Sequence, residues 1–471
     1  MAISLANIWK AAGLPEGESV QLQKLVNEYN QHYKKNRQKN KYYEGHIQLS
    51  EVNLGIALPQ ELSKLEIGCA WGEKTVDVLA SRSMFDGFVS EAGQQADDIT
   101  QIMAANRLTS EYMKACRDEL KYGCTFATLS ADDEIGVRIR FHSPETSAAL
   151  WDGEKQRISC GFAIIDSKQS NDDKTWKPSL VNFYTDNAIW VLTRDRDRWY
   201  AQEYPHSMGR PLMEPLIWNA TSGKPFGRSR LKEPVRHLIE GYVRTVANAT
   251  IGLEFATSPQ KYLLGITDEQ YDVVVNQKFR QYVGAILAAT TNPETGQNPV
   301  FGQLQQGNIE PHVQMLRVLA TQFSAATGLT VTDTGVVNDA NPTSSEAILA
   351  QSQTLVLMAE QLNAGNGEAL YAIAQMALAI AKNVRMEDLS DDDKSIMAHF
   401  KNPAMPSVSV TADAAIKIAT ARPEFAQTDT FLEMAGFDQA DIRRIKAQET
   451  KARGTTTLSE EFGDDLSGGV A

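Results

Sequence analysis

The chain has 471 residues, of which 42% are hydrophobic and 31 are glycine, a composition typical of a globular protein with about three domains. Acidic residues outnumber basic ones by 59 to 46, and the net charge is −13. Because Lys and Arg drive binding to phosphates, this charge argues against tight binding of nucleic acid over a broad surface. The four cysteines have no CxxC spacing, which excludes a disulfide framework and a zinc ribbon. We expect buried, reduced thiols of a cytosol-like compartment.

The sequence lacks the motifs that mark common catalytic and cofactor sites. It contains no GxxxxGK[ST], GxGxxG, GxSxG or HExxH pattern and no EF-hand loop, and its seven histidines are scattered. We therefore predict no catalytic residue, no cofactor and no metal site, although a triad assembled from distant residues would leave no such pattern. The first ten residues do not have the pattern of a signal peptide, and no apolar stretch is long enough to span a bilayer.

The first third of the chain is predicted to be helical. Helices are expected over residues 21–43, 71–82 and 96–122, with Gly123 ending the last of them. Five cations lie near the end of the first helix: Lys34, Lys35, Arg37, Lys39 and Lys41. They form either a solvated helix face or a contact with nucleic acid or an acidic partner.

From Cys124 to Asn219 the apolar residues alternate with polar ones, and polar or Gly/Pro turns separate the runs. This period of two predicts an antiparallel meander. The acidic segment Asp132–Glu134 and the alternating charges of Arg194–Arg198 are interpreted as hairpin turns rather than as a metal site or a functional ion ladder.

An apolar stripe then predicts a long helix that starts near Ser229 and reaches Phe255, because Pro234 is tolerated only in a first turn. A compact module follows over residues 258–307. Within it we expect a short helix opening at Thr267 and strands over residues 261–264, 283–289 and 300–304.

A second helix is predicted over residues 308–328, with Asn308 as its N-cap and Gly328 as its C′ residue. Residues 329–342 form a loop that contains no Lys or Arg. A capping box at Thr343 begins a long helical stretch to Lys382, which we expect Gly365-Asn366-Gly367 to soften. Short helices around Gly436 and a polar, acidic, disordered tail from Thr455 to Ala471 complete the chain.

Several short segments occur in a characteristic order between about residues 20 and 450: Asn40–Gly45, Asn53–Ala57, Ala80–Arg82 with Asp86–Phe88, Phe226–Arg230, Ala325–Leu329 and Asn341–Ile348. With this order of elements, the chain resembles the portal proteins of tailed double-stranded DNA bacteriophages of the long-tailed siphophage type.

The resemblance implies an α+β, mainly α fold in the subunit of a ring of usually twelve copies. Its parts would be a wing over residues 1–228, a stem helix over 229–257, a small α/β clip over 258–307, a second stem helix over 308–328, a tunnel loop over 329–342, a long helix returning to the wing over 343–410, a helical crown over 411–454, and the tail over 455–471.

The resemblance also implies roles for individual residues. The tunnel loop would line the DNA channel through Asp333, Thr334, Val336, Val337, Asn338, Asp339 and Asn341. The stem would pack through Leu231, Val235, Leu238, Tyr242, Val246, Val313, Leu316 and Phe323. Partner proteins would dock on the clip at Lys278, Arg280, Glu294 and Gln297.

A portal ring occupies one capsid vertex, and double-stranded DNA is packaged and ejected through it. The partners implied are further copies of the chain, the DNA, the large terminase, the head–tail adaptor and the major capsid or scaffolding protein, with no membrane. The chain would belong to the virion after assembly in the host cytoplasm. Two other interpretations stay open: another head or neck component such as an adaptor or scaffold, and a soluble multidomain enzyme with a dispersed site.

Overall fold

The computed structural model of the chain describes residues 5–48, 66–90, 97–169, 176–196, 198–257, 261–265, 291, 296, 298, 300–303, 308–336, 345–404, 408–437, 441–442 and 444–451. The chain divides into two compact units, each described separately below. Unit 1 comprises residues 1–37, 77–229 and 353–471, and unit 2 comprises residues 38–76 and 230–352. Residues 38–76, which we assigned to the wing, therefore group with the two predicted stem helices.

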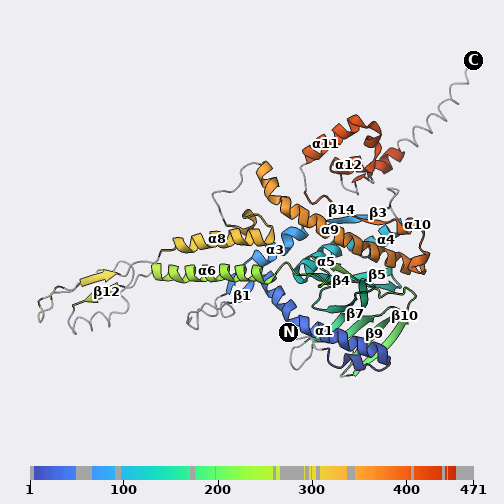
Figure 1. Cartoon of the computed structure of the whole chain (residues 1–471), viewed down its shortest axis with the longest axis horizontal. Helices are drawn as coiled ribbons and strands as arrows, with labels where there is room; N and C mark the ends of the chain where they lie inside the picture. The colour runs from blue at the N-terminus through green and yellow to red at the C-terminus, as the bar shows by residue number, and fades with distance from the viewer. Residues whose placement is uncertain are drawn as a thin grey trace, which may run out of the picture. The chain divides into compact units, whose positions relative to one another are not determined.

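In the first half of the chain, helices and short strands up to α5 are followed by an unbroken run of strands from β4 to β11 (Figure 1). Their bounds are η1 Ile8–Lys10, α1 Glu16–Glu44, β1 His46–Gln48, β2 Glu66–Gly68, α3 Trp71–Ala80, β3 Phe85–Val89, α4 Asp97–Ala105, α5 Leu108–Tyr122, β4 Cys124–Asp132, β5 Gly136–His142, β6 Ser147–Asp152, β7 Arg157–Gln169, β8 Trp176–Tyr184, β9 Ala188–Asp195, β10 Arg198–Pro205 and β11 Met213–Ile217.

The second half is mainly helical. Its elements are α6 Glu233–Thr257, β12 Lys261–Leu264, β13 Val300–Gln303, α8 Glu310–Thr327, η3 Thr332–Thr334, α9 Ser345–Lys382, η4 Met386–Asp388, α10 Asp391–Lys394, β14 Met397–Phe400, α11 Val408–Ala421, η5 Pro423–Gln427 and α12 Asp429–Met434. The mixed, mainly helical fold class is confirmed.

The predicted meander is present in unit 1, but it is divided between two sheets. Strands β6 to β10 form an antiparallel sheet in the order β10-β9-β8-β7-β6, whereas β4, β5 and β11 form a separate sheet in the order β11-β4-β5. Strand β11 pairs with β4 in a register that places Ile217 opposite Cys124. The alternation of apolar residues predicts strands but does not say which strands pair, so the division was not foreseen.

Helix α1 covers one face of the five-stranded sheet with an apolar stripe in its first half. Leu22, Leu25, Val26 and Tyr29 are buried there, together with Phe162 of β7. The rings of Tyr29 and Phe162 meet edge to face with centroids 5.5 Å apart, and the Tyr29 hydroxyl donates to the Glu145 carbonyl at 2.5 Å. This packing forms the main apolar core of unit 1.

The helix predicted over residues 96–122 is two helices, α4 and α5. The chain bends between them at Arg107, whose φ of 50° lies in the left-handed region and cannot continue a helix. Gly123 ends α5 as predicted, with a φ of 111° and its N–H donating to the Glu119 carbonyl at 2.7 Å.

Helix α9 runs without interruption from Ser345 to Lys382, so Gly365-Asn366-Gly367 does not break the helix. The side chain of Asn366 is fully buried, and its amide donates to Tyr112 at 2.9 Å and to Glu119 at 2.8 Å. These bonds to α5 hold the helical conformation at a site of weak helix formers.

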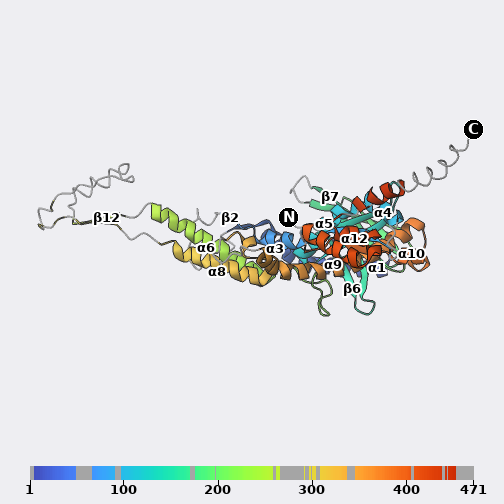
Figure 2. The same ribbon diagram turned by 90° about the horizontal axis from the view of Figure 1, so that it is seen from above.

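Unit 2 is built around α6 and α8, which lie side by side (Figures 1 and 2). Helix α6 begins at Glu233 rather than Ser229, and α8 begins at Glu310, where the Asn308 side chain accepts a bond from the Glu310 N–H at 2.9 Å. The strands predicted at residues 261–264 and 300–304 are confirmed as the antiparallel pair β12–β13. The helix predicted at Thr267 and the strand at 283–289 lie outside the described residues.

All four cysteines are buried thiols, as predicted. Within the described part of the chain, no helix is both long enough and apolar enough to cross a membrane. The tail from Thr455 to Ala471 lies outside the described residues.

We predict that Phe162→Ala lowers the free energy of unfolding by about 3–5 kcal/mol, because the fully buried ring leaves a cavity beneath α1. Chemical denaturation of the full chain measures the change. Tyr200→Ala, on a side chain that is 44% exposed, is the control and should change stability far less. Equal effects of the two substitutions would contradict this account of the core.

Candidate functional site

The segment predicted to face DNA begins at the end of α8 with a tightly bonded turn. Gly328 adopts the left-handed conformation, and its N–H donates to the Ser324 carbonyl at 2.9 Å. Next, the N–H and hydroxyl of Thr330 both donate to one carboxylate oxygen of Asp333, at 2.9 and 2.8 Å. Because its polar groups are satisfied within the turn, this first part of the loop has a defined conformation.

Trp71, at the start of α3, connects this turn to both long helices. Its indole ring lies 4.6 Å, between centroids, from Tyr242 of α6 and also from Phe323 of α8. Its Nε1–H donates to the Thr334 carbonyl at 3.0 Å. The next residue, Gly72, packs so closely against the end of α1 that an added Cβ would overlap the Tyr42 carbonyl oxygen. One buried side chain thus couples α6, α8 and the start of the loop.

A buried cation, Arg230, connects the segment before α6 to α3 and to the end of α8. The guanidinium of Arg230 donates to the Thr75 carbonyl at 2.6 Å and to the Thr327 carbonyl at 2.7 Å. Thr327 is the last residue of α8, where the partial negative charge of the helix end favours a cation. Burial lowers the pKa of Arg230 to about 10, so the side chain stays charged at neutral pH.

The C-terminal end of α1 is joined to α6 through one aromatic residue. The Tyr42 hydroxyl donates to Glu240, and the guanidinium of Arg236 lies 5.6 Å from the centre of the Tyr42 ring. Arg236 and Glu240 are one helical turn apart on α6, so a single tyrosine bridges both charges.

The structure shows where two of the predicted tunnel-loop residues lie in the single chain. Thr334 is only 8% exposed, and one carboxylate oxygen of the half-buried Asp333 accepts bonds from Thr330. The polar groups of Asp333 and Thr334 form hydrogen bonds within the turn. The composition of the loop, which has no Lys or Arg, does not reveal these bonds. Val336 is half-buried. The remaining predicted residues, Val337, Asn338, Asp339 and Asn341, lie outside the described residues.

The predicted stem residues fall into three groups. Leu231, Val235 and Phe323 are buried; Leu238, Tyr242, Val246 and Leu316 are half-buried; and Val313 is exposed. The buried line on α6 continues from Val235 through Ile239, Val243 and Ala247, at every fourth position. Leu238, Tyr242 and Val246 flank it rather than forming its centre.

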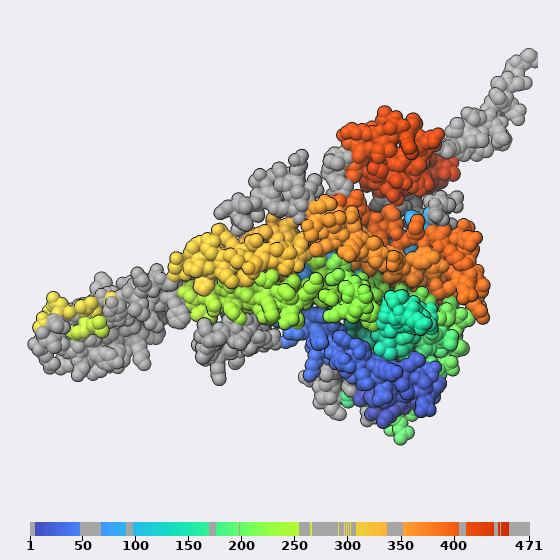
Figure 3. Space-filling view, in the orientation of Figure 1, coloured from blue at the N-terminus to red at the C-terminus, as the bar shows by residue number. Residues whose placement is uncertain are grey.

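Four large apolar side chains are exposed on this pair of helices. Leu253 of α6 is 46% exposed, and Val313, Met315 and Val318 of α8 are 37%, 47% and 50% exposed. Figure 3 shows both helices at the surface along much of their length. Large apolar side chains that are exposed in the single chain are candidates for burial on assembly.

The predicted clip residues Lys278, Arg280, Glu294 and Gln297 lie outside the described residues. In the basic stretch of α1, Lys34, Lys35 and Arg37 are exposed, whereas the neighbouring Asn36 is buried and donates to the Pro144 carbonyl at 3.3 Å. Both interpretations of the cations therefore remain.

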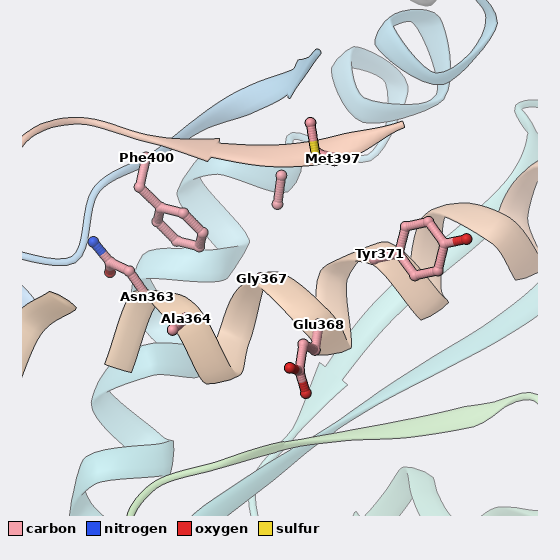
Figure 4. A pocket seen from close by; sticks show the side chains of 8 residues that line it. Asn363, Ala364, Gly367, Glu368, Tyr371, Met397 and Phe400 are labelled. Carbon is pink, nitrogen blue, oxygen red and sulfur yellow. The ribbon is translucent and has the colours of Figure 1, made fainter. Parts of the chain in front are cut away.

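Two of the cavities among the described residues of unit 1 lie beside α9. One, of about 720 Å³, lies beside β9, β10 and the end of α9 and includes His206, whose pKa burial lowers. The other, of about 530 Å³, lies between α9 and β14 (Figure 4). Among the described residues, no group of three or more His, Cys, Asp or Glu side chains is placed to hold a metal ion.

Sequence reasoning missed Trp71 and Arg230. Arg230 ends the segment Phe226–Arg230 on which the resemblance rests, and that was the available signal. No sequence signal pointed to Trp71, because its role depends on contacts with residues more than 150 positions away in the chain.

The fold and the site define a structural subunit in which two helices support a loop. The profile of the family described as "Phage portal protein, SPP1 Gp6-like" matches residues 22–454. The chain belongs to this family, which is structural rather than enzymatic.

Solved structures of gene transfer agent (GTA) particles include similar chains. A chain from the virion of the native particle is 10% identical, with a TM-score of 0.45, and the match covers 78% of this chain and 89% of that chain. Chains from the neck of the empty particle, computed with C6 symmetry, and of the native particle, computed with C12 symmetry, are 10% and 11% identical. Their TM-scores are 0.46 and 0.45, and they cover 77% and 78% of this chain and 89% of theirs. No curated protein matches the chain.

We predict that Trp71→Phe, which keeps a ring between the helices but removes the donor to Thr334, lowers the unfolding free energy by about 1 kcal/mol. Hydrogen exchange of the amides over residues 330–335 should become faster, because the turn loses its tie to α3. Trp176→Phe, on a side chain that is 45% exposed, is the control. Unchanged exchange over 330–335 would show that the indole N–H does not hold the turn.

Proposed function

We propose that twelve copies of this chain form the portal ring at one vertex of a phage head, and that double-stranded DNA enters and leaves the head through its channel. The observation that carries this proposal is the match to the phage portal family over residues 22–454. In the virion, the ring would bind the major capsid or scaffolding protein. Residues 258–307 would bind the large terminase during packaging and the head–tail adaptor afterwards, through Lys278, Arg280, Glu294 and Gln297.

The exposed apolar side chains of α6 and α8 support assembly through a second copy of the chain. On the described part of the helices proposed as the stem, these side chains are Leu253, Val313, Met315 and Val318. Burying such side chains between neighbouring subunits removes apolar surface from water, which contributes about 25 cal/mol per Å².

The loop after α8 supports the proposed path of the DNA. Its first part is fixed by Trp71 and by the Thr330–Asp333 bonds, and the segment from Val336 to Asn341 follows it in the chain. That segment contains no Lys or Arg, and every copy carries a net charge of −13. A channel of this kind makes few phosphate contacts, so DNA moves through it without breaking many ion pairs at each step.

Assembly is tested with Val318→Asp. The substitution places a charge on a side chain that is 50% exposed in the single chain, so the subunit should fold normally. At a subunit interface the unpaired charge would be buried, at a cost of several kcal/mol per contact, and the ring should not form.

Size-exclusion chromatography with light scattering distinguishes a ring of about twelve times 52.0 kDa from a monomer. Val20→Asp is the matched control, because Val20 of α1 is 48% exposed but lies in unit 1. A ring formed normally by Val318→Asp would reject the stem as an interface, and a wild-type chain that stays monomeric would favour a different function.

The path of the DNA is tested with Asn338→Lys. It would place about twelve cations around the channel, and packaging should become slower at low salt because each cation binds phosphate. The defect should decrease as salt rises, since counterions screen these contacts. Asn338→Gln is the neutral control. Packaging at the wild-type rate by Asn338→Lys at low salt would mean that another segment faces the DNA.

A further inference from the structure

A fully buried acidic side chain in unit 1 contacts the middle of α9. Glu119 of α5 and Asn366 of α9 both have no exposed surface. The Asn366 Nδ2 group donates one hydrogen to Glu119 Oε2, at 2.8 Å, and the other to Tyr112 Oη, at 2.9 Å. Tyr112 Oη also lies 2.7 Å from Ser83 Oγ. The cluster thus joins α5, α9 and the turn after α3 without contact with solvent.

Two acceptor atoms in this cluster have no hydrogen-bond partner among the described residues. They are Glu119 Oε1 and Asn366 Oδ1, the second oxygens of the two groups that already share a bond. A carboxylate at Glu119 would leave both acceptors unpaired and a negative charge buried, which is strongly unfavourable. A proton on Oε1 removes the negative charge and turns this unpaired acceptor into a donor, for which the unpaired Asn366 Oδ1 is the complementary acceptor.

The surrounding groups do not supply a compensating charge. Tyr112 and Cys116 face the site from α5, Ser83 from the turn after α3 and Asn366 from α9. Burial keeps Tyr112 and Cys116 neutral by raising the pKa of each. Arg117 interacts electrostatically with Cys116, but it forms an ion pair with Asp77, in which Nε lies 3.5 Å from Oδ2. Burial also raises the pKa of Glu119 from 4.5 to about 8, in agreement with the hydrogen-bond pattern.

The two glycines beside Asn366 are not required by space or by backbone conformation. A Cβ at Gly365 would lie 4.0 Å from the Ile217 carbonyl oxygen, and one at Gly367 would lie 3.8 Å from the Phe400 ring, both ordinary contacts. Their φ angles are not positive. What the pair does is weaken the helix locally, since glycine has more conformational freedom to lose than any other residue.

Space is available for this part of α9 to move. The cavity of about 530 Å³ between α9 and β14 is lined by Ala364, Gly367 and Tyr371 from the helix and by Met397 and Phe400 from the strand (Figure 4). In Figure 4, the side of the helix at Gly367 faces this space with no side chain to fill it. Residues 365–367 are therefore bonded to α5 through Asn366, and they lie beside the cavity at Gly367.

We propose that Glu119 is held as a neutral carboxylic acid paired with Asn366, and that this pair is a proton-dependent latch on a hinge in α9 at residues 365–367. While the proton is present, α9 is a continuous helix. Loss of the proton leaves a buried charge that is relieved when Asn366 separates from α5 and the glycine-flanked segment opens toward the cavity.

The sign of the pH dependence follows from the two pKa values. Glu119 titrates at 4.5 when exposed and at about 8 when buried, so the closed state holds one more proton between these values. The equilibrium constant for opening therefore increases with pH, by up to tenfold per pH unit, and becomes constant above pH 8. The stabilisation of the closed state by the proton is fully present below pH 4.5 and is lost as the pH rises through about 8.

Hydrogen exchange of the full-length chain, corrected for the intrinsic pH dependence of exchange, measures this opening at residues 363–369. In the wild type, the opening constant should rise by up to a hundredfold from pH 6 to pH 8. Glu119→Gln, whose amide donates to Asn366 Oδ1 without ionising, should show no such rise. Glu111→Gln, at a partly exposed site on the same helix, is the control and should behave like the wild type.

An infrared titration provides a second measurement that does not require a variant of Glu119 to fold. With glutamate carboxyls labelled by carbon-13, a protonated-carboxyl band should be present at pH 7 and disappear near pH 8 to 9, in the wild type and in Glu214→Gln. The latter removes the other glutamate whose pKa burial raises. The proposal is overturned by a band that is absent at pH 6, or by a pH-dependent opening that persists in Glu119→Gln.

Discussion

The tilted contacts of the Trp71 ring with Tyr242 and with Phe323 are the interaction on which the rest of unit 2 depends. An indole ring presents two large apolar faces, so one side chain fills the space between two helices and sets their separation. Its single polar group would be costly to bury without a partner, and the Thr334 carbonyl supplies that partner at 3.0 Å. The packing of α6 against α8 and the conformation of the loop that follows are therefore determined together.

Arg230 adds a polar constraint to the same arrangement. Burying a guanidinium is expensive, and here the cost is offset by donation to two backbone carbonyls, one of them at the end of α8. Because these acceptors belong to α3 and α8 while Arg230 precedes α6, separating any one of the three elements would break at least one bond to a buried charge. The proposed channel loop thus begins at a rigid junction, and its fixed part reaches Gly335.

Unit 1 also buries an ionisable side chain, Glu119, but there burial favours the neutral form. Arg230 keeps its charge because backbone dipoles face it, whereas Glu119 has only an amide, a hydroxyl and a thiol as neighbours, and none of these stabilises an anion strongly. A buried cation makes a permanent connection, while a buried acid that holds a proton makes a connection that depends on pH. The two units thus differ in how their buried ionisable side chains are stabilised.

The sequence by itself determined the order of the elements, most of their bounds, the absence of cations between residues 329 and 342, and the family, because apolar periodicity, caps and short segments are local properties. It did not determine the division of the meander into two sheets or the continuity of α9 through Gly365-Asn366-Gly367. Nor did it reveal that Thr334 is buried or that Trp71 and Arg230 join the helices. Periodicity records which side of an element is buried, but the partner that buries it is decided by contacts between residues far apart in the chain, and these exist only in the tertiary structure.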